Sequence, residues 1–154
     1  RNVTGVQTCA LPIYPGLLND GYRQIIQDLK LDVLMIDTHP GLNEETLLSI
    51  AVSDVLGIIM RPDQQDYQGT SVTLEVASKL EVPKILLLVN KSPAAFSTAE
   101  LAKKITQTYG CTVSGVIPHS DDMMTLASSG VFSLRYPDHP ITMMYKQLAS
   151  RLMS

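Results

Sequence analysis

A carboxylate stands directly after the first apolar run of this 154-residue chain. Asp37 follows residues 33–36, and the turn after it contains Gly41. If the run is a parallel strand, Asp37 lies at its carboxyl end, where ligands of α/β sheets bind. A carboxylate there can hold Mg²⁺ through water, and glycine lets the backbone turn towards a terminal phosphate. A turn-forming Asp explains the same residues, so this motif alone leaves both interpretations open.

The third apolar run, residues 84–89, ends in Asn90 and Lys91. In nucleotide-binding folds an Asn at a strand end can hydrogen-bond the base, and a carboxylate three residues later reads guanine. Here that position is Pro93, which offers no carboxylate to the guanine edge, so adenine is favoured. The alternative for Asn90 is a loop residue that bonds its own backbone.

The fourth run, residues 112–117, ends in Pro118, His119 and Ser120, followed by two Asp residues. Pro118 stiffens the exit from the strand. The Asp pair is typical of the first turn of a helix, and we interpret Asp121 in this way. This loop is expected at the same edge of the sheet as Asn90.

These motifs lie in a chain that alternates helical periodicity with short apolar runs. The pattern predicts an α/β fold with a parallel sheet flanked by helices on both faces. Strands are expected over residues 33–36, 55–60, 84–89 and 112–117. Helices are expected over residues 17–30, 44–52, 68–80, 97–109, 121–128 and 140–152, with Asn43 and Ser97 or Thr98 as N-caps and Gly110 as a left-handed stop.

Composition excludes several classes of function. The formal net charge is -3, so no strong attraction to DNA or to an anionic membrane is expected. The two cysteines, Cys9 and Cys111, lack partners at metal-binding spacing and do not form a disulfide framework. No apolar run reaches the roughly 18 residues of a membrane span, and we expect a cytoplasmic protein.

The first 13 residues differ in kind from the rest. Back-translated codons for residues 3–13 resemble a common short-read sequencing adapter. We therefore interpret residues 1–13 as a non-native, adapter-derived segment and exclude them from the fold. The segment also lacks the alternation of a strand.

Three blocks of sequence carry a specific resemblance. "DVLMIDTHPGLNEETLLSIAVSDVLGIIMRPD", "VPKILLLVNKSP" and "GVIPHSDDMMTLASSGVFSL" stand in the order and approximate spacing of the MinD/ParA family of P-loop ATPases. The resemblance implies ATP and Mg²⁺ as cofactors and a slow ATPase that acts as a dimerisation switch in positioning or partitioning. It assigns Walker B and switch II roles to Asp37, Thr38, Pro40 and Gly41, with Mg²⁺ bound to Asp37 through water, and adenine contacts to Asn90, Pro118 and Ser120. His39 and His119 depart from the family pattern, and we interpret His39 as a variant switch residue.

The resemblance also implies what this chain lacks. The phosphate loop, its signature lysine and switch I should precede residue 14, so residues 14–154 are expected to be the C-terminal part of a single P-loop ATPase domain. In the family the phosphate-loop strand lies in the middle of the sheet, beside the Walker B strand. The intact parent is expected to form an ATP-dependent homodimer and to respond to an activator protein. A basic amphipathic tail for membrane association is not visible.

Two other classes of protein compete with this interpretation. A response-regulator receiver domain would be phosphorylated on Asp37, but receivers usually place Pro four residues after the Asp, and Pro40 is three residues after it. A flavodoxin-like binding module comes third, because the chain has no glycine-rich cofactor loop.

Overall fold

The computed structural model describes residues 15–153, so the predicted adapter-derived segment lies outside the described residues. The chain divides into two compact units, with the division between His39 and Pro40. Each unit is described by itself.

The first unit contains helix α1, Pro15–Leu29, followed by a segment without regular secondary structure. The helix was predicted over nearly these residues. It ends where Lys30 adopts a left-handed φ of 51° and Leu31 N–H donates to the Ile26 carbonyl at 3.0 Å. This pair of features is a usual helix stop.

The strand predicted over residues 33–36 is not formed. The segment has no regular secondary structure, and none of the described residues pairs with it in a sheet. Val33 and Met35 are 51% and 77% exposed. An apolar run becomes a strand only when a neighbouring strand accepts its backbone hydrogen bonds, and this one finds no such neighbour.

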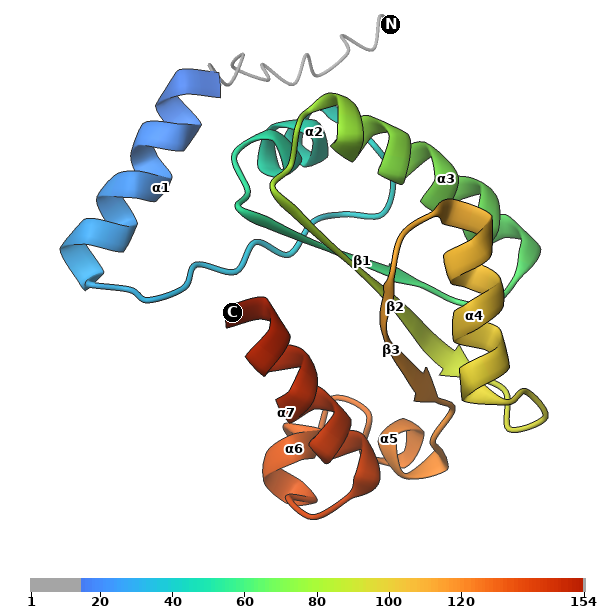
Figure 1. The fold of residues 1–154 in the computed structure, drawn as a ribbon. Coiled ribbons are helices and arrows are strands. Elements are labelled where there is room, and N and C mark those ends of the chain that lie inside the picture. The colour runs from blue at the N-terminus through green and yellow to red at the C-terminus, as the bar shows by residue number, and fades with distance from the viewer. Residues whose placement is uncertain (1–14, 154) are drawn as a thin grey trace, which may run out of the picture. The chain divides into compact units, whose positions relative to one another are not determined.

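The second unit is an α/β structure built on a three-stranded parallel sheet with order β1-β2-β3 (Figure 1). The strands are β1 Val55–Met60, β2 Lys84–Ser92 and β3 Val113–Pro118. The helices are α2 Glu44–Ala51, α3 Gln64–Lys79, α4 Thr98–Tyr109, α5 Asp121–Leu126, α6 Phe132–Arg135 and α7 Pro140–Met153. The predicted fold class, a parallel sheet flanked by helices, is confirmed.

Capping residues fix the helix boundaries much as the sequence predicts. The Asn43 side chain accepts a hydrogen bond from Thr46 N–H at 2.8 Å, and Ser97 caps α4. Gly110 ends α4 with a φ of 64°, the left-handed conformation that glycine adopts without strain.

Helix α3 begins four residues before the predicted start. Asp63 accepts a hydrogen bond from Asp66 N–H at 3.0 Å and so caps a helix that starts at Gln64, within the stretch predicted as a loop. Strand β2 likewise runs to Ser92, three residues beyond its predicted end. The short helix α6 was not predicted.

The two faces of the sheet carry separate hydrophobic clusters. On one face, residues of β1 and β2 pack against α4, namely Ile58, Met60, Leu87, Val89, Leu101 and Ile105. On the other, Ile117 of β3 packs with α6 and α7 through Phe132, Ile141 and Leu148, beside Leu88 of β2. Leu87 and Leu88 thus point to opposite faces, as strand geometry requires. Figure 1 shows α4 and α7 on either side of β3.

On the face of β1 opposite α4, the apolar residue Ile59 is exposed. Ile59 is 67% exposed although its neighbours Ile58 and Met60 are buried. β1 is also an edge strand of this sheet. Among residues 15–153, no helix is long and apolar enough to span a membrane.

Candidate functional site

A β-bulge lies where β2 approaches its carboxyl end. Val89 pairs with Val116 and Ser92 pairs with Pro118, so β2 uses three residues where β3 uses two. Lys91 has a φ of 53°, in the left-handed region that residues other than glycine rarely adopt. Bulges of this kind redirect the side chains beside them and are common near binding sites.

Asn90 lies in the bulge, and its side-chain amide bonds the bulge's own backbone. Asn90 Oδ1 accepts a hydrogen bond from Lys91 N–H at 2.9 Å. This backbone bond is the one foreseen as the alternative to base binding, and it uses only the oxygen. The Asn90 amide nitrogen carries two donors that this contact does not use.

Strand β3 ends beside the bulge. His119 N–H donates to the Ser92 carbonyl at 2.9 Å, which joins the segment after β3 to the end of β2. Ser120 caps α5 by accepting from Met123 N–H at 3.3 Å. The structure therefore brings Asn90, Pro118 and Ser120 to the carboxyl ends of two adjacent parallel strands, the place where α/β sheets bind ligands.

Ser92 is a buried polar residue at this junction. It is 1% exposed, and its hydroxyl has no hydrogen-bond partner among the described residues. Buried hydroxyls normally have partners, so a small shift of the bulge or an ordered water is needed to satisfy this one.

The residues predicted for the phosphate side are divided between the two units. Asp37 and Thr38 are exposed in the first unit, and Gly41 lies at the start of the second. Gly41 has a φ of 99°, which fits the sharp turn expected of it. The structure therefore assembles the predicted base-side residues within the second unit, while Asp37 and Thr38 belong to the first.

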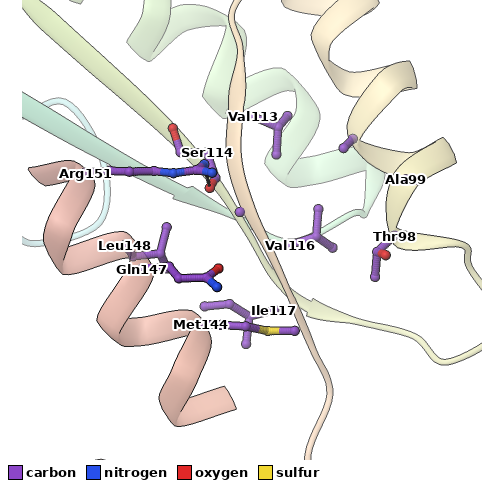
Figure 2. A pocket seen from close by; sticks show the side chains of 12 residues that line it. Thr98, Ala99, Val113, Ser114, Val116, Ile117, Met144, Gln147, Leu148 and Arg151 are labelled. Carbon is purple, nitrogen blue, oxygen red and sulfur yellow. Dashed lines mark hydrogen bonds between the residues drawn. The ribbon is translucent and has the colours of Figure 1, made fainter. Parts of the chain in front are cut away.

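Two hollows lie near the sheet, and neither is lined by a predicted site residue. One, of about 340 Å³, runs along the outer side of β3 between α4 and α7, with Thr98 on one wall and Gln147 and Arg151 on the other (Figure 2). The other, of about 280 Å³, lies beside Tyr67, Phe96 and Lys104.

Charged pairs surround the carboxyl ends of the strands. After β1, Asp66 accepts hydrogen bonds from the Arg61 backbone at 2.7 Å and from its guanidinium at 3.3 Å. These bonds lower the pKa of Asp66 below its usual value. After β3, His119 lies 3.3 Å from Asp121 and His139 lies 3.5 Å from Asp122. Over residues 15–153 no group of three His, Cys, Asp or Glu side chains could hold a metal ion.

Sequence reasoning missed two features of this site. The bulge at Asn90 and Lys91 has no recognisable sequence signal, because Lys is an unusual residue for a left-handed position. The contact of His139 with Asp122 joins positions 17 residues apart and depends on the short helix α6 between them.

Comparison with known proteins gives one distant similarity. The chain is 26% identical over 129 residues to an uncharacterized ATP-binding protein of the archaeon Methanocaldococcus jannaschii. The match covers 82% of this chain and 48% of that relative, so the chain spans about half of the relative's length. No model of a known protein family matches the chain.

Proposed function

We propose that the intact protein to which this chain belongs binds ATP with Mg²⁺ and hydrolyses it slowly. In this proposal it acts as a MinD/ParA-type switch that dimerises on ATP and serves intracellular positioning or partitioning. The observation that carries the proposal is the meeting of Asn90, Pro118 and Ser120 at the carboxyl ends of β2 and β3. The similarity to a protein described as ATP-binding supports the same class of ligand.

The groups at the strand ends fit a purine base. The unused amide donors of Asn90 suit a ring nitrogen of the base, which both purines offer. Pro118 closes the end of β3 without a backbone N–H, so it presents an apolar surface to a flat ring. The preference for adenine rests on Pro93, because a carboxylate at that position would be needed to accept from the guanine edge.

Mg²⁺ would be held on the phosphate side. Asp37 is an exposed carboxylate followed by the left-handed turn at Gly41. A single carboxylate binds Mg²⁺ through retained waters, and the phosphates supply the remaining oxygens. When bound, the metal neutralises charge that develops on the transferred phosphoryl group. Asp37 would orient the metal's waters, while Thr38 and Gly41 would position the backbone near the terminal phosphate.

Hydrolysis by the intact protein tests the proposal. The full-length wild type should release phosphate from Mg-ATP slowly, and Asp37→Ala should abolish turnover because the carboxylate that orients the metal is lost. Glu44→Ala, which removes an exposed carboxylate from the first turn of α2, is a suitable control and should retain turnover. Normal hydrolysis by Asp37→Ala would reject the assignment.

The same material distinguishes the receiver-domain alternative. Incubation with acetyl phosphate and Mg²⁺, followed by intact-mass measurement, should give no phosphorylated wild type. A phosphoryl group on Asp37 would instead support a receiver domain.

A further inference from the structure

We infer that His139 is a positioning residue that holds the loop Pro118–Ser120, the proposed base-binding loop, through Asp122 and Phe132. The inference rests on the proposed function, since it gives His139 a role in binding the base. Its basis is a set of contacts that join the start of α7 to the first turn of α5.

His139 occupies the N-cap position of α7. Its carbonyl accepts from Met143 N–H at 3.1 Å, and its Nδ1 accepts from Ile141 N–H at 3.1 Å. Because Pro140 has no N–H, Ile141 carries the first N–H inside the helix, and the imidazole satisfies it. A His ring thus performs the capping role that Ser, Asp or Asn usually performs.

This cap selects one tautomer of the ring. Nδ1 accepts a hydrogen bond, so it carries no proton, and the proton of the neutral ring is on Nε2. Nε2 lies 3.5 Å from Asp122 Oδ2. The Nε2–H group therefore faces the Asp122 carboxylate in the first turn of α5, while Nδ1 of the same ring caps α7.

Asp122 is close to the proposed base-binding loop. It lies in the first turn of α5, two residues after Ser120, whose hydroxyl caps the same helix. A contact that holds this turn also holds the backbone that leaves β3. His119, one residue before Ser120, is already bonded to the end of β2 through its N–H.

A second route runs through the aromatic core. The His139 ring stands edge-on to Phe132, with centroids 5.0 Å apart and planes at 86°. Phe132 is buried in the cluster that contains Ile117, the residue before Pro118. His139 thus supports both ends of the loop, one through Phe132 and one through Asp122.

The paired contact after β3 serves as the control. His119 and Asp121 approach within 3.3 Å, and their side chains are 48% and 98% exposed; those of His139 and Asp122 are 25% and 67% exposed, so the control pair is the more exposed of the two. Exposed pairs contribute little. Asp121→Asn and Asp122→Asn each remove one carboxylate from the first turn of α5, so their effects on the helix dipole match.

The experiment uses the intact protein and two probes, Mg-ATP and inorganic tripolyphosphate. His139→Asn retains an N-cap acceptor but cannot reach Asp122, so the two contacts are separated. Asp122→Asn and His139→Asn should each weaken ATP binding by about three- to fivefold, and the double variant no further. Tripolyphosphate affinity should be unchanged in all of them, because the phosphate side does not use this loop. Asp121→Asn should alter ATP binding less than about twofold.

The affinities for ATP and for tripolyphosphate together separate a role in base binding from a general structural role. Equal losses for ATP and tripolyphosphate would mean a general structural role and overturn the inference. Wild-type ATP affinity in both Asp122→Asn and His139→Asn would overturn it as well, while leaving the proposed function intact. Absence of ATP binding in the wild type would reject the proposed function and this role with it. Nitrogen-15 NMR of the imidazole provides an independent check, since a neutral His139 ring with its proton on Nδ1 rather than Nε2 would contradict the capping geometry whatever the nucleotide does.

Discussion

The guanidinium of Arg151, on α7, donates a hydrogen bond to the backbone carbonyl of Ser114, on β3. Ser114 is the extra residue of a bulge, since Leu87 and Leu88 of β2 pair with Val113 and Gly115. A bulge leaves a residue outside the ladder, so its carbonyl needs another partner. Figure 2 shows the two side chains beside each other at one end of the hollow along β3.

Loss of this contact should destabilise the intact protein. Arg151→Met retains the stem of the side chain but removes the donor, and we expect a loss of about 1 kcal/mol in the free energy of unfolding. Lys146→Met removes one positive charge from an exposed position of the same helix and should be nearly neutral. Urea denaturation monitored by circular dichroism measures the stability of both variants. Equal urea midpoints for Arg151→Met and the wild type would contradict a role for the Arg151 bond.

A second prediction concerns the close approach of α7 to the sheet. A Cβ at Gly115 would lie 3.0 Å from Leu148 Cδ2, whereas a Cβ at Gly57 of β1 would meet nothing within 4 Å. Gly115→Ala should therefore cost about 1–3 kcal/mol, because Leu148 must move out of a packed cluster. Gly57→Ala, a change of the same size in the same sheet, should not destabilise the protein. The same urea denaturation assay measures both variants. Wild-type stability of Gly115→Ala would show that Leu148 and α7 can move away from the sheet at little cost.

The pair after β1 predicts a pH dependence. Hydrogen bonds from Arg61 lower the pKa of folded Asp66 below its unfolded value of about 3.9. The stabilisation is therefore fully present above about pH 4 and is lost as the pH falls through the lower folded pKa. Asp66→Asn should make the thermal midpoint decrease less steeply below pH 4, whereas Asp54→Asn, at an exposed carboxylate, should leave the decrease as in the wild type. An identical acid profile for wild type and Asp66→Asn would contradict this prediction.

Base preference gives a prediction for the proposed nucleotide site. The intact protein should bind ATP more tightly than GTP, because Pro93 stands where a guanine-reading carboxylate would be. Pro93→Asp should reduce the preference for ATP over GTP. Asn90→Ala should weaken the binding of both nucleotides by about three- to tenfold, because the amide donors are lost. Competition against a fluorescent ATP analogue measures these affinities. Equal or tighter binding of GTP by the wild type would reject the adenine assignment.

The 154-residue chain alone should bind no Mg-ATP in a calorimetric titration and should aggregate. The first expectation rests on the resemblance, since phosphate affinity comes largely from loop amides and a lysine that the family carries upstream. The second rests on β1, an edge strand with Ile59 67% exposed. Ile59→Lys should reduce aggregation measured by light scattering, whereas Val72→Lys, at a 52% exposed residue of α3, should have little effect. Micromolar ATP binding with a cooperative thermal transition would contradict both expectations.

Local sequence determined most of the secondary structure. Apolar runs predicted both ends of β1 correctly and each end of β3 to within one residue. Asn43, Ser97 and Gly110 marked helix ends because capping depends on residues within three or four positions. The early start of α3 was missed because Asp63 and Asp66 lie among other polar residues that resemble a loop.

Tertiary structure decided what depends on a partner distant in the chain. Residues 33–36 have the composition of a buried strand, yet they pair with no other part of the described residues 15–153, because a ladder needs a neighbour that composition does not reveal. The sequence by itself placed Asn90, Pro118 and Ser120 near the carboxyl ends of their strands, although β2 runs past Asn90 to Ser92 and β3 includes Pro118. Only the register between β2 and β3 set the bulge that directs Asn90, and only the packing of α6 and α7 brought His139 to Asp122, since both arise from contacts between elements rather than from spacing within one.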